Sequence, residues 1–261
     1  MIELTNFSKS YSSKNDSFAV KDFSMVCKKG EITGLLGLNG AGKTTILKAI
    51  CARHFATSGS VLVEGLNASE ESEKVREITG FVAEEPHFPG EYTVFEYLKM
   101  VAELHGMNSK TQIHANERGL EKKQSACICV NPRLIHSLYL EELLRKKIRT
   151  LSKGQRERVN FAQALIYTPS VLVLDEPASG LDPAQIVNMR ALVKSLKSDH
   201  TILLSTHLMQ EVEALCDRVY IIHEGRLAAS GTAEEIARAS GCKNLEEAFF
   251  KITTEGKGEA K

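Results

Sequence analysis

One stretch of this sequence has the residue types and spacing of a phosphate-binding loop. From Gly37 to Thr44 the sequence is GLNGAGKT, which matches the pattern G-x-x-x-x-G-K-[ST]. Glycines let the backbone curl so that successive N–H groups point at phosphate oxygens, some with φ values that a side chain disfavours. Lys43 would supply a cation for the β- and γ-phosphates, and the Thr44 hydroxyl can bind Mg²⁺. The stretch therefore predicts a site for a nucleoside triphosphate and Mg²⁺.

A second stretch supplies two carboxylates. The apolar residues 171–174 are followed by Asp175 and Glu176. They predict a central strand of a covered parallel sheet, whose carboxyl end is the edge where ligands bind. We expect Asp175 to hold Mg²⁺ through water and Glu176 to orient and deprotonate the water that attacks the γ-phosphate. The alternative is a solvated acidic turn, which the presence of the phosphate-binding loop disfavours.

The loop needs a strand before it and a helix after it. Residues 32–36 predict a buried strand, and residues 45–50 predict a helix whose N-terminus adds positive charge near the phosphates. Farther along, residues 145–149, RKKIR, predict a solvated helix end and not a nucleic-acid patch. These elements alternate as an α/β protein should.

The segment 151–156, LSKGQR, lies between the two stretches. With them it resembles the nucleotide-binding cassettes of ATP-binding cassette (ABC) proteins, whose signature at this place is L-S-G-G-Q; Lys153 departs from that pattern. The resemblance implies that Ser152, Gly154 and Gln155 contact the γ-phosphate bound by an opposite cassette. A serine hydroxyl and the backbone amides that open a helix over residues 155–165 suit an anion, and we expect Ser152 to cap that helix as well.

The resemblance extends over nearly the whole chain. Residues 179–182, SGLD, are similar to the loop whose last residue, here Asp182, the family places at the partner's nucleotide. His207 stands at the place of the switch histidine, whose neutral imidazole can donate one hydrogen bond to the γ-phosphate. Tyr11 precedes Gly37 by 26 residues (37 − 11), where the family has an aromatic that stacks on adenine. The alternatives are a satisfied polar residue for His207 and a surface tyrosine for Tyr11.

The family has a glutamine where this chain has Glu84. A carboxylate can bind Mg²⁺ as an amide oxygen does, and it adds charge; the alternative is that Glu84 faces solvent. The resemblance thus implies catalytic roles for Glu176, His207 and Glu84, and metal ligands in Thr44, Asp175 and Glu84. The residues predicted to contact ATP are Tyr11, Gly37, Leu38, Asn39, Gly40, Ala41, Gly42, Lys43, Thr44 and Thr45.

Composition limits the partners and the location. Lys plus Arg and Asp plus Glu number 33 each, so no overall field attracts nucleic acid. No run approaches the ~20 apolar residues of a membrane span, and the N-terminus lacks the features of a secretory signal. The six cysteines lack zinc-site spacing, even Cys127 and Cys129, so we expect reduced, mostly buried thiols. We expect a cytoplasmic protein.

The resemblance implies a P-loop cassette with a mainly parallel central sheet, an N-terminal antiparallel β region and a helical subdomain. Residues 1–261 would form a single ABC ATPase domain, with a core over 1–88 and 151–261 and the helical subdomain over about 89–150. The cofactors would be ATP and Mg²⁺. The partners would be a second cassette, identical or not, and a polytopic membrane subunit, so that the protein would be peripheral on the cytoplasmic face of the cell membrane.

Two functions from other classes are weighed against transport. The closing segments over 225–236 and 244–253 are similar to export-type bacterial cassettes, which favours export over import. A soluble ABC ATPase that acts on ribosomes or nucleic acid is disfavoured by the neutral charge and by the 114-residue gap between Gly37 and Leu151 (151 − 37), which leaves no room for a long coiled coil. A catalytically silent cassette is disfavoured by Lys43, Asp175 and Glu176.

Overall fold

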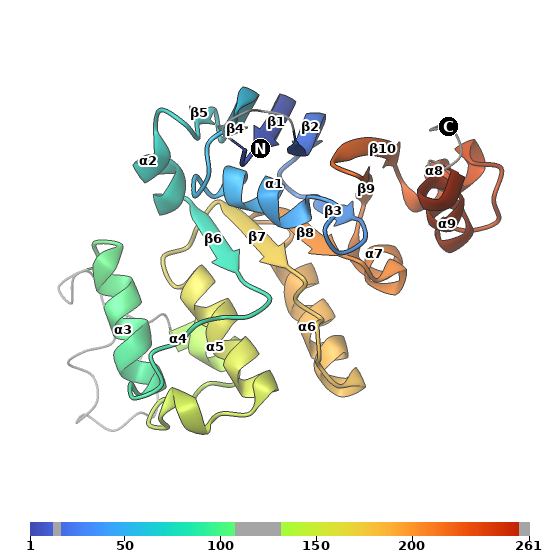
Figure 1. The fold of residues 1–261 in the computed structure, drawn as a ribbon. Coiled ribbons are helices and arrows are strands. Elements are labelled where there is room, and N and C mark those ends of the chain that lie inside the picture. Colours follow the sequence, from blue (N-terminus) through green and yellow to red (C-terminus); the bar gives the residue numbers. More distant parts are fainter. Residues whose placement is uncertain (13–16, 108–131, 256–261) are drawn as a thin grey trace. The chain divides into compact units, whose positions relative to one another are not determined.

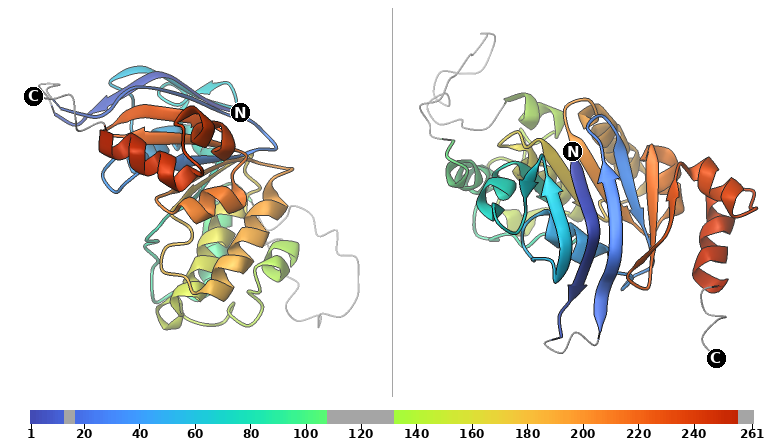
Figure 2. Two further views of the ribbon diagram at one scale, coloured as in Figure 1. Left: turned by 90° about the vertical axis from the view of Figure 1, so that its right-hand side faces the viewer. Right: turned by 90° about the horizontal axis from the view of Figure 1, so that it is seen from above.

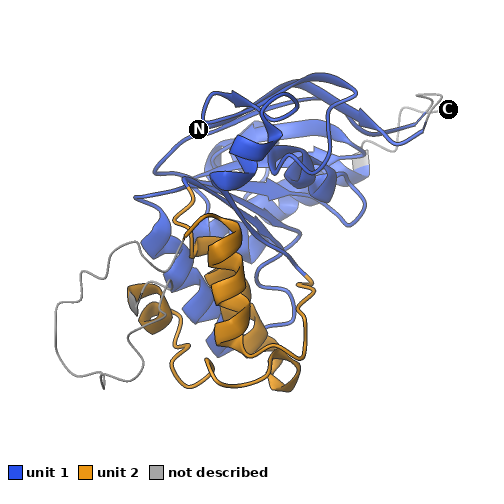
Figure 3. Cartoon of the chain, turned by 90° about the vertical axis from the view of Figure 1, so that its left-hand side faces the viewer, with its two compact units in different colours: residues 1–84, 170–261 blue, residues 85–169 orange. Residues whose placement is uncertain are grey.

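The computed structural model describes residues 1–12, 17–107 and 132–255. The chain divides into two compact units, one of residues 1–84 with 170–261 and one of residues 85–169 (Figure 3). This division puts the helix after the signature with the helical unit, whereas the sequence analysis places residues 151–261 with the core. The assignment of domains stays a prediction.

The first unit contains two sheets and six helices in its described part (Figure 1). Its strands are β1 (Ile2–Ser10), β2 (Phe18–Cys27), β3 (Ile32–Leu36), β4 (Ser58–Val63), β5 (Leu66–Asn67), β6 (Thr79–Val82), β7 (Val171–Asp175), β8 (Thr201–Thr206), β9 (Arg218–His223) and β10 (Arg226–Gly231). Its helices are α1 (Lys43–Ile50), α2 (Ser72–Glu77), α6 (Pro183–Leu196), α7 (Met209–Leu215), α8 (Ala233–Ala239) and α9 (Leu245–Glu255).

The larger sheet positions the site. Its order is β10-β9-β3-β8-β7-β6, in which β9, β3, β8, β7 and β6 are parallel and β10 is antiparallel. Every residue of β3, β7 and β8 is buried, as expected for strands covered on both faces. Leu36 pairs with Thr206, and Asp175 pairs with Ser205. The loops that follow β3, β6, β7 and β8 therefore leave the sheet at one edge.

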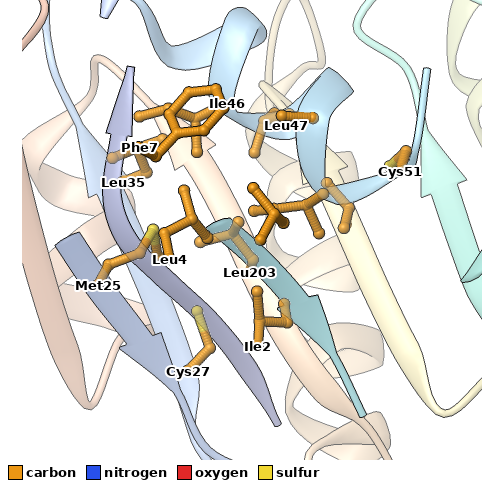
Figure 4. Close-up of a cluster of buried hydrophobic side chains, with 14 of the residues drawn as sticks. Ile2, Leu4, Phe7, Met25, Cys27, Leu35, Ile46, Leu47, Cys51 and Leu203 are labelled. Carbon is orange, nitrogen blue, oxygen red and sulfur yellow. The ribbon is translucent and has the colours of Figure 1, made fainter. Parts of the chain in front are cut away.

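The smaller sheet, β2-β1-β4-β5, is antiparallel. Its inner side chains meet those of α1 and of the parallel strands in one hydrophobic core; Figure 4 shows Phe7 and Leu35 with Ile46 and Leu47 of α1. Full burial of such a side chain stabilises the fold by about 1.5–3 kcal/mol. Because Ile46, Leu47 and Ile50 are all fully buried, the core holds α1 in place.

A second cluster covers the other face of β3 and β9. Leu36 and Ile221 pack there with Val212 of α7, Ile236 of α8 and Leu245 of α9. Side chains of neighbouring strand positions point to opposite faces, which explains why Leu35 belongs to the first cluster and Leu36 to the second. Both views of Figure 2 show α8 and α9 side by side at the β9–β10 hairpin.

The second unit contains helices and no strand in its described part: α3 (Val94–Leu104), α4 (Pro132–Ser137), the 3₁₀ helix η1 (Ile148–Thr150) and α5 (Lys153–Leu165). On α3, Val94 and Leu98 are buried and Val101 is half-buried. Tyr97 of α3 donates a hydrogen bond to Gln163 of α5 at 2.5 Å. Within the described ranges, no helix has the length and hydropathy that spanning a membrane would require.

The prediction of a helix end over residues 145–149 was wrong. These residues form a turn that leads into η1, because the backbone of Lys147 is extended and bridges Thr93. Lys147 and Arg149 each form an ion pair with Glu91 at 2.9 Å. The basic side chains therefore hold the loop before α3 and do not face a helix dipole.

Candidate nucleotide site

The phosphate-binding loop joins β3 to α1 and depends on two of its glycines. A Cβ on Gly37 would lie 2.6 Å from the carbonyl oxygen of Ile222, which no side chain tolerates. Gly42 has φ +112°, and a Cβ there would lie 2.8 Å from the carbonyl oxygen of Ala19. As the N-cap of α1, Gly42 also has no side chain to accept hydrogen bonds from the first N–H groups of the helix. Those donors suit an anion such as phosphate.

Lys43, the first residue of α1, is buried with only 6% of its side chain exposed. Its ammonium donates hydrogen bonds to the carbonyl oxygens of Gly37 at 2.7 Å and Leu38 at 3.4 Å. The same ammonium lies 3.1 Å from Oε1 of Glu176, whose side chain is 7% exposed. The structure thus brings the predicted phosphate-binding cation and the predicted general base into one buried pair.

Glu176 follows β7 with a left-handed backbone, φ +48°, which costs a non-glycine residue about 1–3 kcal/mol. Its N–H donates to Ser205, to the carbonyl oxygen at 3.1 Å and the hydroxyl at 3.3 Å. Its Oε2 accepts a hydrogen bond from the backbone N–H of His207 at 3.3 Å and lies 2.9 Å from Nδ1 of the same residue. The carboxylate is held between Lys43 and His207.

Asp175 ends β7 and is buried. Burial raises the pKa of its carboxyl group, and the charges of Glu176 and Glu84 raise it further, while Ser205 and Lys43 act in the opposite direction. The hydroxyl of Ser205 donates to Oδ1 of Asp175 at 2.6 Å. Crowded carboxylates of this kind are stabilised by a nearby cation.

The donors at this edge suit Mg²⁺ held jointly with a nucleotide. Among the described residues, no group of three or more His, Cys, Asp or Glu side chains forms a protein-only metal site. Mg²⁺ prefers few carboxylates together with water and substrate phosphates. Asp175 offers such an oxygen, and Thr44 lies exposed in the first turn of α1.

Glu84 lies two residues beyond β6 and is exposed. Its Oε1 accepts a hydrogen bond from the Ser179 hydroxyl at 3.3 Å, which links the loop after β6 to the loop after β7. Because its charge contributes to the raised pKa of Asp175, Glu84 belongs to the same electrostatic cluster. The position is compatible with a metal ligand.

Tyr11, which directly follows β1, contacts helix α1. Its hydroxyl lies 3.3 Å from Oγ1 of Thr45, and 58% of the residue is exposed. Of the other predicted loop contacts, Leu38, Asn39 and Gly40 are exposed and Ala41 is buried. The exposed positions are open to a ligand.

The family model described as ABC transporter matches residues 20–179, more than half of the chain. The chain is a cassette of the ABC transporter family. The predicted family is confirmed. The ABC transporter ATP-binding protein NatA of Bacillus subtilis is 31% identical over 264 residues, which cover 98% of this chain and 99% of NatA. The linearmycin resistance ATP-binding protein of the same organism is 32% identical over 261 residues, covering 100% of this chain and 77% of that protein.

Solved structures confirm the predicted fold class of the cassette. An ATP-binding subunit of an ABC transporter superimposes with a TM-score of 0.81 at 28% identity, covering 97% of this chain and 99% of that one. A dimeric bacterial cassette in a post-hydrolysis state, bound to ADP and phosphate, superimposes with a TM-score of 0.75 over 89% of this chain and 98% of that one. At 23% identity, the second likeness concerns the fold alone.

The residues predicted to contact a partner's nucleotide are found at helix starts. Ser152 caps α5 by accepting a hydrogen bond from the N–H of Gln155 at 3.3 Å, and Gln155 Oε1 accepts one from Ser152 at 3.1 Å. Because of this cap, α5 begins at Lys153, two residues earlier than predicted; Gly154 is buried in its first turn. Asp182 caps α6 through Gln185 at 2.9 Å.

The sequence predicted no role for two residues that orient the acidic side chains of the site, Ser205 and Ser179. Ser205 bonds Asp175 and Glu176, and Ser179 bonds Glu84. A signal existed for Ser205, since it is a polar residue that follows the apolar run 202–204, one position before the strand ends. Its partner could be known only from the register of β7 and β8.

The described cysteines of the cassette are free thiols. Cys27 and Cys51 are buried, and Cys216 and Cys242 are partly buried. Burial raises the pKa of the Cys27, Cys51 and Cys216 thiols to about 12 each, which makes them poor nucleophiles. The pair Cys127 and Cys129 lies outside the described residues.

Proposed function

We propose that this cassette binds MgATP, hydrolyses it with Glu176 as the general base, and drives export through a separate membrane subunit. The observation that carries the proposal is the buried pair of Lys43 and Glu176, with His207 bound to the same carboxylate, beside the phosphate-binding loop. Lys43 would hold the β- and γ-phosphates, and Glu176 would take the proton of the attacking water. His207, 40% exposed, would donate to the γ-phosphate.

Mg²⁺ would supply charge neutralisation at the phosphate oxygens. In this chain Thr44, Asp175 and Glu84 would hold it, with Asp175 acting through water. Ser205 would orient Asp175, because its hydroxyl bonds one carboxylate oxygen at 2.6 Å and leaves the other oxygen for the metal side. The base of ATP would stack on Tyr11, and the loop from Gly37 to Thr45 would enclose the phosphates.

The nucleotide site would be completed by a second cassette arranged head to tail. Ser152, Gly154, Gln155 and Asp182 would contact the partner's ATP, since helix starts with polar caps offer hydrogen-bond donors to an anion. Two solved structures of the same fold, each 23% identical to this chain, are dimeric, which supports a second cassette as the partner. No nucleic acid would take part, because the charge is balanced.

Export is supported by the names of relatives. A bacitracin transport ATP-binding protein of Enterococcus faecalis is 32% identical over 238 residues, covering 90% of this chain and 70% of that protein. A Nod factor export ATP-binding protein of Burkholderia orbicola is 34% identical over 247 residues, covering 94% of this chain and 75% of that protein. The cassette would lie on the cytoplasmic face of the cell membrane. Co-purification with a polytopic membrane protein, and transport assays in vesicles of both orientations, test this part.

Substitution of Lys43 tests nucleotide binding directly. Lys43→Ala should weaken MgATP binding by about 10- to 100-fold, the worth of a charge-assisted hydrogen bond to phosphate. The control is Lys197→Ala, which removes a cation that pairs with Asp217 at 2.6 Å in the same unit. Titration calorimetry of both variants gives the affinities. Equal MgATP affinity in the Lys43→Ala variant and the wild type would overturn the assignment of the loop.

A further inference from the structure

Tyr11 is exposed, so its ring is oriented by few contacts. It follows β1 directly, and 58% of the residue is exposed. A mobile tyrosine side chain loses rotamer entropy when a ligand fixes it. If the ring is already held in the binding orientation, that entropic cost is not charged against the affinity for the base. One contact is the hydroxyl of Thr45 in α1, 3.3 Å away.

The second contact is the ring of His54. The two ring centroids are 5.6 Å apart with an interplanar angle of 81°, which is an edge-to-face arrangement. Such pairs are attractive because the edge of one ring is positive and the face of the other is negative. A hydroxyl contact alone leaves the ring free to rotate about its long axis, and the imidazole restricts that rotation.

His54 is itself held in place by the backbone. Its N–H donates to the carbonyl oxygen of Lys48 in α1 at 3.3 Å, and the side chain is half-buried. Burial lowers the pKa of His54, and the like charges of Lys48 and Lys9 lower it further. The imidazole is therefore neutral at neutral pH and adds no charge beside the aromatic ring.

Three hydrogen bonds join the segment that carries His54 to β1, the strand directly before Tyr11. Lys9 donates to the carbonyl oxygen of Phe55 at 2.8 Å. The N–H of Thr57 donates to Ser8 at 2.8 Å, and the Thr57 hydroxyl accepts from Ser10 at 3.0 Å. The two rings thus stand on backbone segments that cannot move independently.

We propose that His54 is a positioning residue of the nucleotide site, which fixes the Tyr11 ring in the orientation that stacks on a purine base. This inference rests on the proposed function, in which Tyr11 meets the base. Lys9 also lies 5.3 Å from the centroid of the Tyr11 ring, but its ammonium is bound to Phe55 and serves the backbone. His54, by contrast, contacts the ring itself.

The test compares a ligand that has a base with one that has none. Binding of MgATP and of Mg-tripolyphosphate is measured for wild type, His54→Ala and His54→Phe. His54→Ala should weaken MgATP binding and raise KM by about 2- to 10-fold, the worth of an edge-to-face pair, with kcat and tripolyphosphate affinity unchanged. His54→Phe, which keeps an aromatic edge, should restore MgATP affinity.

The control is His105→Ala, which removes a histidine stacked on Tyr167 in the other unit, with ring centroids 3.7 Å apart. His105→Ala should leave the affinities for MgATP and for Mg-tripolyphosphate unchanged. Equal weakening of both ligands by His54→Ala, no weakening of MgATP, or failure of His54→Phe to restore it would overturn the inference. A wild-type chain that binds neither ligand would instead refute the proposed function, so the two failures are distinguishable.

Discussion

The loop edge of the parallel sheet and the start of α5 are both assigned to the γ-phosphate, yet they are built differently. At the sheet edge the charged groups are buried, with Lys43 and Glu176 in contact and the pKa of Asp175 raised. At the start of α5 the neutral side chains of Ser152 and Gln155 bond each other's backbone as a helix cap. Buried ionisable groups can take up or release protons, whereas neutral cap residues form hydrogen bonds without a change of charge. We infer that the sheet edge performs the chemistry and α5 supplies binding to a partner.

The largest effect is expected at Glu176. Glu176→Gln keeps the shape of the side chain but cannot take a proton from water, so hydrolysis should fall by on the order of 10²- to 10⁴-fold. MgATP binding should persist, because Lys43 and the loop are intact. Phosphate release and MgATP affinity of the purified variant are the measurements.

A matched control for that change is Glu211→Gln. Glu211 is also a buried glutamate paired with a cation, Arg190 at 2.7 Å, but it lies outside the site. The Glu211→Gln variant should have a lower free energy of unfolding, with unchanged ATP turnover per folded molecule. Near-normal hydrolysis in Glu176→Gln would move the general base elsewhere.

A smaller, pH-dependent effect is expected at Asp175. Because its pKa is raised above the ordinary value of about 3.9, the folded state binds this proton more tightly than the unfolded chain does. Ionised Asp175 therefore costs stability above the raised pKa, and the cost disappears as the pH falls toward about 3.9. Asp175→Asn should be more stable than wild type at pH 7.5, with a difference that shrinks on acidification.

Urea unfolding between pH 7.5 and 4.5 measures that difference. The control is Asp182→Asn, since Asn caps a helix nearly as well as Asp. In the presence of nucleotide, Asp175→Asn should weaken Mg²⁺ binding by about 10- to 100-fold. An Asn variant that is less stable at pH 7.5, or a gap that does not depend on pH, would contradict the buried-charge account of this edge.

The smallest effect is expected for Glu84→Gln, a change at the exposed member of the cluster. Glu84→Gln removes one charge but keeps an oxygen, so half-maximal hydrolysis should shift to about 2- to 5-fold higher Mg²⁺. Glu84→Ala should lose activity, and Glu85→Gln serves as the neighbouring control. Superimposable Mg²⁺ titrations for wild type and both Glu84 variants would show that Glu84 is a loop residue without a metal role.

Local patterns in the sequence predicted the fold class and the local elements that carry the candidate site. The loop from Gly37 to Thr44, the strand that delivers Asp175 and Glu176, and the cap at Ser152 each depend on residues close in sequence. A prediction of this kind needs only local geometry. These positions are where sequence and structure agree.

What the sequence could not predict depends on contacts between distant residues. The hydrogen bond from Ser205 to Asp175 depends on the register of two strands. The edge-to-face pair of Tyr11 and His54 depends on the hydrogen bonds between β1 and the segment after α1. The left-handed backbone of Glu176 is held by Ser205 and is invisible in residue type. The prediction of a helix end over residues 145–149 was wrong because ion pairs of Lys147 and Arg149 with Glu91 outweighed the helix-like composition.

Mixing two damaged chains tests the division of labour between the sheet edge and α5 most directly. Lys43→Ala damages the loop half of each site, and Ser152→Arg damages the α5 half, so either homodimer has no intact site. A mixed dimer combines the intact loop of one chain with the intact α5 of the other. The account predicts that an equal mixture recovers up to about a quarter of wild-type hydrolysis, since half of the dimers are mixed and each has one intact site of two. Activity no higher than the mean of the two separate variants, or wild-type turnover per chain that does not depend on protein concentration, would contradict it.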